Sequence, residues 1–405
     1  MSPLEPPAPV LRALRAVRRA GTPLCAYVYH LGTVRRTARA VRAALPDRAD
    51  LYYAVKANGH DRVLAALAPL VAGFEVASLG EARAVTGALG THSQRPVRAG
   101  HPRLLASGPA KTDRELTGLV DLGVAQVNVE STHELRRLAR IGAAAGIAVP
   151  VALRVNRAGV PLGGSHRMAG VPTQFGLDPD LVGPAVRLAR SLPGVDVHGF
   201  HLHAVSNNTD ATAHAEFVAE AVRWSAMTAR RHGVALRTVD VGGGIGVAYD
   251  GGPAFDLAAF GAALRSVPVP DGVRLVFELG RFLVAGAGWY AAEVVDVRRT
   301  HGRYFAVLRG GMHHFRLPSA WRMNHPFTVL PVDEWPYPWP RPGVSDAAVD
   351  VTGELCTPRD VFARDVPVAR LRAGDVVVFA LAGAYGWEIS HHDFLRHPHP
   401  AHLVV

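Results

Sequence analysis

The sequence contains almost no lysine, although it is rich in basic residues. Among 44 lysine and arginine residues, only Lys56 and Lys111 are lysines. Arginine therefore supplies positive charge wherever charge alone is needed. Because a guanidinium is not deprotonated in proteins, it cannot serve as an amine nucleophile. A lysine retained against this bias suggests chemistry that needs an amine. Lys56, which follows a predicted strand, is the stronger candidate, and chance retention explains Lys111 better.

Cysteine and long hydrophobic runs are also scarce. The two cysteines, Cys25 and Cys356, are too few to form a disulfide framework in 405 residues, which favours free thiols and a cytoplasmic enzyme. The longest apolar run near the middle of the chain, Phe282 to Ala292, contains glycine and is too short to cross a membrane. Because Met1–Arg19 lacks the apolar segment of a secretory signal, we expect a short disordered leader there and no membrane partner.

The charge of the chain is strongly positive, at +10 with a pI of about 10.2. The arginines are scattered along helical segments such as Arg12–Arg19 and Arg35–Arg42, without a compact basic run interleaved with aromatic residues. This pattern indicates a solvated, arginine-biased surface rather than a nucleic-acid partner. Apolar residues make up 49% of the chain, which is enough for a large core and excludes disorder.

Short apolar strands alternate with amphipathic helices between residues 30 and 285. Eight such strands predict an α/β fold with a closed (β/α)₈ TIM-like barrel. An open doubly wound sheet is the alternative, but no glycine-rich dinucleotide fingerprint follows the first strand. The predicted strands are Leu51–Val55, Gly73–Val76, Arg103–Ala106, Gln126–Val129, Pro150–Val155, Val197–Leu202, Arg237–Val241 and Arg274–Phe277. Predicted helices include Ser131–Ala145, Pro179–Leu192 and Ala211–His232.

The pattern changes after residue 285, where short strands with proline- and glycine-rich turns predict an all-β domain. The predicted strands are Val294–Val297, Tyr304–Arg309, Thr328–Pro331, Ala348–Thr352 and Asp375–Ala380. The early strand-like segment Pro23–His30 could join them. We therefore predict a leader and strand over 1–30, a barrel over 31–285 and a β-domain over 286–405.

Polar and glycine-rich elements follow several predicted barrel strands, and in such barrels the carboxyl ends of the strands form the catalytic face. Lys56 ends the first strand, where apolar neighbours would favour a neutral, nucleophilic amine. Gly242–Gly244 follow the seventh strand and would let backbone N–H groups approach a phosphate. Glu278 and Arg281 follow the eighth, where they could pair with a protonated ring nitrogen and a phosphate. An internal ion pair between these two residues is the alternative.

Two histidines close the sixth strand. Alternation places His201 and His203 on one face, which suggests a metal site at first sight. Because no other cluster has clear metal-ligand spacing, we expect no metal, and instead a histidine stacked on a planar cofactor with Ser206 on a phosphate. In the β-domain, Cys356 and Tyr385 add a thiol and a phenol. An amine, a ring-nitrogen partner, a stacking ring, a phosphate cradle and a proton donor are what pyridoxal 5'-phosphate requires.

These motifs resemble those of the fold-type III pyridoxal-phosphate decarboxylases, the group that includes diaminopimelate and ornithine decarboxylases. The matching motifs run in family order from about residue 23 to residue 390. They are Tyr53–Asn58, Leu153–Asn156, Gln174–Gly176, His201–Ser206, Gly242–Gly244, Glu278–Arg281, Cys356–Asp360 and Gly383–Tyr385.

The resemblance implies a role for each matching residue. Lys56 would hold the cofactor covalently, His203 would stack on its ring, and Glu278 would keep the ring nitrogen protonated. Cys356, from the second subunit of a head-to-tail homodimer, would protonate the carbon that loses CO₂. The phosphate would be surrounded by Ser206, Gly243, Gly244, Gly280, Arg281 and Tyr385.

Departures from the family pattern concern the substrate. Thr357 stands where diaminopimelate decarboxylases carry an acid, which removes the expected partner of a distal substrate amine. The segment around Arg316 looks more like decarboxylases of carboxylate-type siderophore biosynthesis, which act on an amino acid already joined to citrate. That resemblance implies that Arg316, His313 and His314 face a citrate-like carboxylate, with Asp360 also on the substrate side.

Three other functions remain open. One is diaminopimelate decarboxylation in lysine biosynthesis, and another is amino-acid racemisation on the same scaffold, against which Cys356 and Asp360 count. The last is a binding protein that has kept the fold. A binder has no need for Lys56, His203, Glu278 and Cys356 at once.

Overall fold

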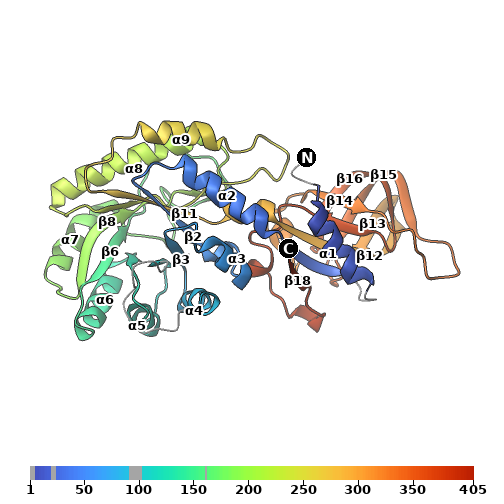
Figure 1. The fold of residues 1–405 in the computed structure, drawn as a ribbon, viewed down its shortest axis with the longest axis horizontal. Coiled ribbons are helices and arrows are strands. Elements are labelled where there is room, and N and C mark those ends of the chain that lie inside the picture. Colours follow the sequence, from blue (N-terminus) through green and yellow to red (C-terminus); the bar gives the residue numbers. More distant parts are fainter. Residues whose placement is uncertain (1–4, 20–23, 91–102, 160–161) are drawn as a thin grey trace. The chain divides into compact units, whose positions relative to one another are not determined.

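The computed structural model describes residues 5–19, 24–90, 103–159 and 162–405 (Figure 1). The chain forms two compact units. The β unit comprises Met1–Val34, Tyr249–Gly252 and Val284–Val405, and the barrel unit comprises Arg35–Ala248 and Pro253–Leu283. The division at residues 30 and 285 stays a prediction about independently folding domains.

Eight parallel strands of the barrel unit close on themselves in the order β10-β11-β2-β3-β4-β5-β6-β8. The predicted α/β barrel is thereby confirmed, and every predicted barrel strand overlaps an observed one. The strands are β2 (Ala49–Ala54), β3 (Gly73–Val76), β4 (Arg103–Ala106), β5 (Gln126–Val129), β6 (Val149–Arg154), β8 (Val195–His201), β10 (Thr238–Asp240) and β11 (Arg274–Leu279).

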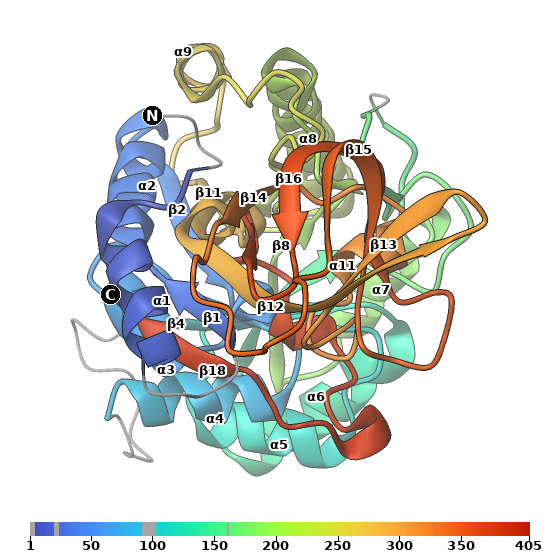
Figure 2. The same ribbon diagram turned by 90° about the vertical axis from the view of Figure 1, so that its right-hand side faces the viewer.

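Helices form the outer layer around these strands (Figure 2). Several of them begin at a side-chain cap, and Thr112 and Glu115 form a complete capping box at α5. The longest helix among the described residues, α8, ends at His232 and is capped by Gly233, whose φ of +64° suits glycine. The helices are α2 (Leu31–Ala44), α3 (Asp61–Leu67), α4 (Leu79–Ala88), α5 (Asp113–Asp121), α6 (Thr132–Ala144), α7 (Val182–Arg190), α8 (Ala211–His232), α9 (Leu257–Arg265) and α10 (Arg281–Val284).

The β unit is built on a sheet in which the long strand β12 pairs with β1, β13 and β17. The early strand β1 lies in this sheet, where it pairs with both β12 and β18. Strands β16 and β18 were not predicted; β16 contains Pro367, a residue that strands rarely accommodate in their interior. The strands are β1 (Cys25–Tyr29), β12 (Gly288–Thr300), β13 (Arg303–Leu308), β14 (Phe327–Leu330), β15 (Gly343–Thr352), β16 (Val361–Arg372), β17 (Val376–Phe379) and β18 (Ala401–Val404).

The expected disordered leader is wrong over most of its length. Residues 8–19 form helix α1 (Ala8–Arg19), which buries Val10 and Leu14, four positions apart on one face. The apolar periodicity therefore outweighs the proline- and arginine-rich composition, while residues 1–4 lie outside the described part of the chain. No helix in the described ranges is both long and apolar enough to cross a bilayer.

Candidate active site

Lys56 lies at the carboxyl end of the barrel strands. Strand β2 ends at Ala54, and a 3₁₀ turn over Val55–Ala57 buries its two apolar residues while the lysine side chain stays 44% exposed. The Nζ atom donates a hydrogen bond to Oε2 of Glu75, on the neighbouring strand β3, at 2.6 Å. Apolar neighbours were expected around this amine, but the buried carboxylate of Glu75 favours its charged form. The amine is thus oriented by an acid and open to a ligand.

Carboxylates gather inside the barrel beside this lysine. Glu75, Asp240 and Glu278, from β3, β10 and β11, are all buried. Nδ2 of Asn128, on β5, donates to Oε1 of Glu278 at 3.1 Å and lies 3.3 Å from Oδ2 of Asp240. Burial raises the pKa of Asp240 to about 7, and burial with the neighbouring carboxylates raises the pKa of Glu278 well above its usual range. This interior would be stabilised by an added cation.

The rings of His201 and His203, at the end of β8, stack on each other, with their centroids 6.3 Å apart and an interplanar angle of 27°. The predicted stacking of a histidine on a planar cofactor stays a prediction. Nε2 of His201 lies 3.6 Å from Oε2 of Glu278, whereas Nδ1 of His203 accepts the N–H of Gly243 at 3.2 Å. Burial lowers the pKa of both rings well below the usual value, so both are neutral at neutral pH. A neutral, half-buried ring at position 203 suits stacking on a planar ligand.

The glycines next to these histidines permit close backbone packing. A Cβ atom on Gly243 would lie 2.2 Å from the carbonyl oxygen of Glu278, and one on Gly244, whose φ is +99°, would lie 2.6 Å from that of Val205. A side chain at Gly280 would meet Ala57 at 2.8 Å. No other residue fits these positions without backbone movement. Arg281 begins α10 in a buried position beside this turn.

The polar groups of the barrel site match those that pyridoxal 5'-phosphate needs. Oε1 of Glu75 and both ring nitrogens of His201 are buried without a hydrogen-bond partner among the described residues. These atoms can therefore form hydrogen bonds with a bound ligand. Lys56 offers the amine, Glu278 an anion for a protonated ring nitrogen, and Arg281 with the glycine turn a place for a phosphate. When bound, this cofactor supplies an aldehyde for the amine and an electron-withdrawing ring.

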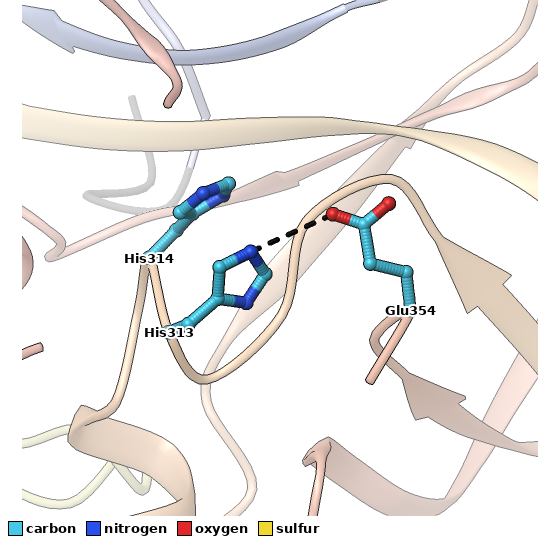
Figure 3. Close-up of side chains that lie close together, drawn as sticks. All are labelled: His313, His314 and Glu354. Carbon is cyan, nitrogen blue, oxygen red and sulfur yellow. Dashed lines mark ion pairs between the residues drawn. The ribbon is translucent and has the colours of Figure 1, made fainter. Parts of the chain in front are cut away.

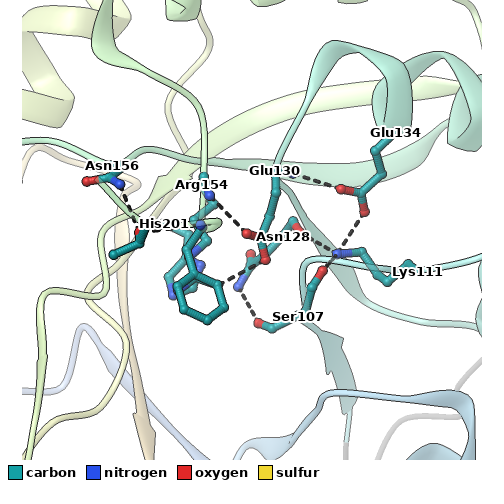
Figure 4. A network of polar contacts seen from close by, with 12 residues as sticks. Ser107, Lys111, Asn128, Glu130, Glu134, Arg154, Asn156 and His201 are labelled. Carbon is teal, nitrogen blue, oxygen red and sulfur yellow. Dashed lines mark hydrogen bonds and ion pairs between the residues drawn. The ribbon is translucent and has the colours of Figure 1, made fainter. Parts of the chain in front are cut away.

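A second polar network supports the site, and sequence reasoning missed it (Figure 4). Lys111 is buried; its Nζ lies 2.7 Å from Oε1 of Glu134 and donates to the carbonyl of Asn128 at 3.0 Å. Its compact ammonium therefore has a structural task, so chance retention does not explain it. Arg154 pairs with Glu130 at 2.9 Å, and Glu130 also accepts the N–H of Gly176. Two motifs of the family resemblance, Leu153–Asn156 and Gln174–Gly176, therefore meet in this network. Polar residues inside otherwise apolar strands were the signal in the sequence that could have revealed it.

The remaining predicted site residues lie in the β unit. Cys356 is exposed and, like Cys25, free. Asp360 is buried and accepts the N–H groups of Met312 at 2.6 Å and Leu355 at 2.9 Å, so its carboxylate stabilises a loop. Arg316 lines a pocket, and Tyr385 adopts a φ of +54°. The roles predicted for these residues, for Ser206 and for the histidine pair at 313 and 314 stay predictions.

Comparison with known proteins identifies the chain's relatives. The family model "pyridoxal-dependent decarboxylase, pyridoxal binding domain" matches residues 31–285. A 2-[(L-alanin-3-ylcarbamoyl)methyl]-2-hydroxybutanedioate decarboxylase of Staphylococcus aureus is 39% identical over 402 residues, covering 98% of this chain and 97% of the relative. The diaminopimelate decarboxylase of Vibrio cholerae is 31% identical over 393 residues, covering 95% and 88%.

Solved structures share the fold. Diaminopimelate decarboxylase from Helicobacter pylori, complexed with L-lysine, matches with a TM-score of 0.82 at 23% identity, covering 96% of this chain and 94% of the other. Lysine/ornithine decarboxylase from Vibrio vulnificus, complexed with putrescine, matches with a TM-score of 0.79 at 21% identity, covering 98% and 99%. The family model over residues 31–285 and the 39% identical Staphylococcus aureus relative, together with the amine, the buried acids and the glycine turn at one barrel end, show that the chain belongs to the family of pyridoxal-dependent decarboxylases.

Proposed function

We propose that this enzyme decarboxylates an L-amino acid whose side chain is joined to a citrate-like polycarboxylate. One observation carries the proposal: a pocket of about 490 Å³ in the β unit is lined by four arginines. They are Arg316, Arg322, Arg359 and Arg364. Only Arg364 has a carboxylate within 4 Å among the described residues, that of Asp350 at 3.9 Å. Uncompensated guanidinium groups around one hollow favour a ligand with several carboxylates.

The relatives support the same substrate class. The substrate in the name of the Staphylococcus aureus relative has a hydroxybutanedioate at one end and an alanine unit at the other. One end is therefore polyanionic, and the other presents the amino and carboxyl groups on which a pyridoxal enzyme acts. The absence of an acid at Thr357 agrees with a substrate that has no distal amine. We place this reaction in siderophore biosynthesis.

The barrel residues have separate roles around the amino-acid end of the substrate. We propose that Lys56 binds the cofactor and that Glu75 orients its amine. Glu278 keeps a negative charge beside the bound ring, and Asn128 fixes that carboxylate by its hydrogen bond. His203 presents its neutral ring for stacking, while Arg281, Tyr385, Ser206 and the backbone at Gly243, Gly244 and Gly280 hold the phosphate. The acids are buried in the barrel interior, where electrostatic interactions are stronger than in water.

A homodimer is the assembly that we propose, in the cytoplasm, with Cys356 from one copy completing the barrel site of the other. The barrel unit contains no cysteine, because Cys25 and Cys356 both lie in the β unit. The exposed, free thiol of Cys356 is available for proton transfer, whereas the buried thiol of Cys25 has its pKa raised to about 12 by burial. Of the two thiols, Cys356 is the better donor to product.

Mixing two inactive variants tests this assembly. Lys56→Ala and Cys356→Ala should each be nearly inactive alone, but unfolding and refolding them together should restore about a quarter of wild-type activity. Random pairing makes half of the dimers mixed, and each mixed dimer has one intact site. CO₂ release from the mixture measures the recovery. Mixtures that stay inactive, although both variants refold as dimers, would show that the thiol and the amine do not meet across copies.

Replacement of pocket arginines tests the substrate class. Arg316→Ala and Arg359→Ala should each raise KM for 2-[(L-alanin-3-ylcarbamoyl)methyl]-2-hydroxybutanedioate about 10- to 100-fold, the effect of one lost charge-assisted hydrogen bond, with little change in kcat. Arg370→Ala, at an exposed position of the same unit, is the matched control. Steady-state CO₂ release gives both constants. Efficient turnover of free diaminopimelate, with none of the citryl conjugate, would replace this proposal by diaminopimelate decarboxylation.

A further inference from the structure

A cluster of histidines in the β unit lies apart from the arginine pocket. His313 and His314 follow strand β13, Glu354 follows β15, and His397 precedes β18. Figure 3 shows the ring of His313 directed at the carboxylate of Glu354, with the ring of His314 beside it. Neither histidine lines the pocket that contains Arg316. Arg316, His313 and His314 were predicted to face the same citrate-like carboxylate of the substrate. The structure offers an alternative, in which the two histidines belong to a separate site.

The spacing of these side chains suits a bound metal better than direct contact. Nε2 of His313 lies 3.6 Å from Oε1 of Glu354, and Nδ1 of His397 lies 3.6 Å from the same oxygen. These distances are too long for hydrogen bonds. Bonds of about 2.0–2.1 Å at tetrahedral angles would place ligand atoms roughly 3.3 Å apart. One ligand atom each from His313, His314 and Glu354 lies within 4.8 Å of the others.

The rings of His313 and His314 are buried, and three of their four nitrogens have no hydrogen-bond partner among the described residues. His313 is 0% exposed, and neither of its nitrogens has a hydrogen-bond partner among the described residues. Nε2 of His314, in a side chain that is equally enclosed, also has none within the described ranges. A buried polar group without a partner destabilises a protein, so these nitrogens are expected to be satisfied by a bound species. Burial, with the nearby histidines, lowers the pKa of His313 to about 4 and that of His314 to about 3. A buried imidazole nitrogen without a hydrogen-bond partner is a suitable donor for a metal ion.

A neighbouring thiol orients one of these rings. Sγ of Cys25 lies 3.6 Å from Nδ1 of His314 and 3.3 Å from the hydroxyl of Tyr290. When Nδ1–H donates to this sulfur, the lone pair of the ring is on Nε2, the nitrogen that has no partner. Metal-binding histidines are commonly fixed in this way through their other nitrogen.

We infer that His313, His314, Glu354 and His397 form a binding site for one divalent transition-metal ion, and that Zn²⁺ is the ion that fits best. Three imidazole nitrogens and one carboxylate oxygen are ligand types that zinc accepts in a four-coordinate site. A site closed by four protein ligands is structural. Glu354 lies two residues before Cys356, so the bound ion would brace the loop that carries this thiol. The inference does not depend on the substrate.

The metal content of the purified holoenzyme tests the site. Tag-free protein is stripped with a chelator, dialysed against Zn²⁺ and analysed by mass spectrometry of the metal. Wild type and His133→Asn, an exposed control on α6, should hold about one zinc ion per chain. Glu354→Gln and His397→Asn should hold at least tenfold less. The side chain of His397 is 31% exposed, so its replacement should leave the fold intact, which circular dichroism checks.

A second variant locates the ion. His201, Asp240 and Glu278 could also hold a metal, but they belong to the barrel site. Glu278→Gln should therefore keep the zinc, and zinc should raise the melting temperature of this variant and of wild type but not of His397→Asn. Wild type with less than a tenth of an ion per chain would overturn the inference. Zinc that disappears with Glu278→Gln, or persists in both Glu354→Gln and His397→Asn, would also overturn it.

Discussion

Lys56→Ala is expected to lower the rate of CO₂ release by about three to five orders of magnitude, the scale expected for loss of a covalent catalyst. The variant should also lack the visible absorption band of lysine-bound cofactor. The reason is chemical, because the alanine side chain offers no amine to the aldehyde. Steady-state kinetics and an absorption spectrum of the purified protein measure the two effects.

Lys56→Arg is the matched control for charge. Arginine keeps a cation beside Glu75 but cannot act as an amine nucleophile, so this variant should be as inactive as Lys56→Ala. In wild type, borohydride reduction should attach the cofactor to the peptide that contains Lys56. Lys111, the only other lysine in the chain, should stay unmodified. Near-normal turnover in Lys56→Ala, or labelling of Lys111 instead, would disprove the assignment.

Glu278→Gln should retain the cofactor but lower kcat by about two to four orders of magnitude. Glutamine has nearly the same volume and can still accept the hydrogen bond from Asn128, but it has no negative charge to hold a proton on the ring nitrogen. Cofactor absorbance per chain and kcat measure the two properties separately. Glu216→Gln, at an exposed position on α8, should behave like wild type.

A comparison with Asp240→Asn shows whether Glu278 alone, or both carboxylates together, keep the ring nitrogen of the cofactor protonated. Asn128 contacts both acids, burial raises the pKa of each, and the nearby charge of Asp240 raises the pKa of Glu278 further. A smaller loss in Asp240→Asn would assign the ring-nitrogen role to Glu278 alone. Unchanged turnover in Glu278→Gln would contradict that role altogether.

Most of the barrel could be predicted from the sequence because its strands are short, apolar and separated by turn residues. The limits of Gly73–Val76, Arg103–Ala106 and Gln126–Val129 are the predicted ones. Strand β16 was missed: it contains Pro367, and only its antiparallel pairing with β15 reveals it as a strand. Helix α1 was missed because composition was weighed above periodicity.

The site was predictable only where it depends on position along a strand. Lys56, His203 and Glu278 follow or end strands, and a parallel barrel gathers such ends without further information. Glu75 and Asn128 required knowledge of which strands are neighbours and which face each other, and that is decided by closure of the barrel. Lys111 was misjudged because its partner Glu134 lies on α6, beyond a further helix and strand, so that the pairing depends on the barrel fold.

The pairing of β1 has a consequence for biosynthesis. Both neighbours of this strand, β12 and β18, are encoded hundreds of residues later, and β18 lies at the very end of the described chain. At a translation rate of about 5–20 residues per second, the first strand waits on the order of tens of seconds for its partners. The barrel strands therefore emerge from the ribosome before the β unit can complete its sheet. Until then, the exposed edge of β1 must be prevented from pairing with a neighbouring polypeptide.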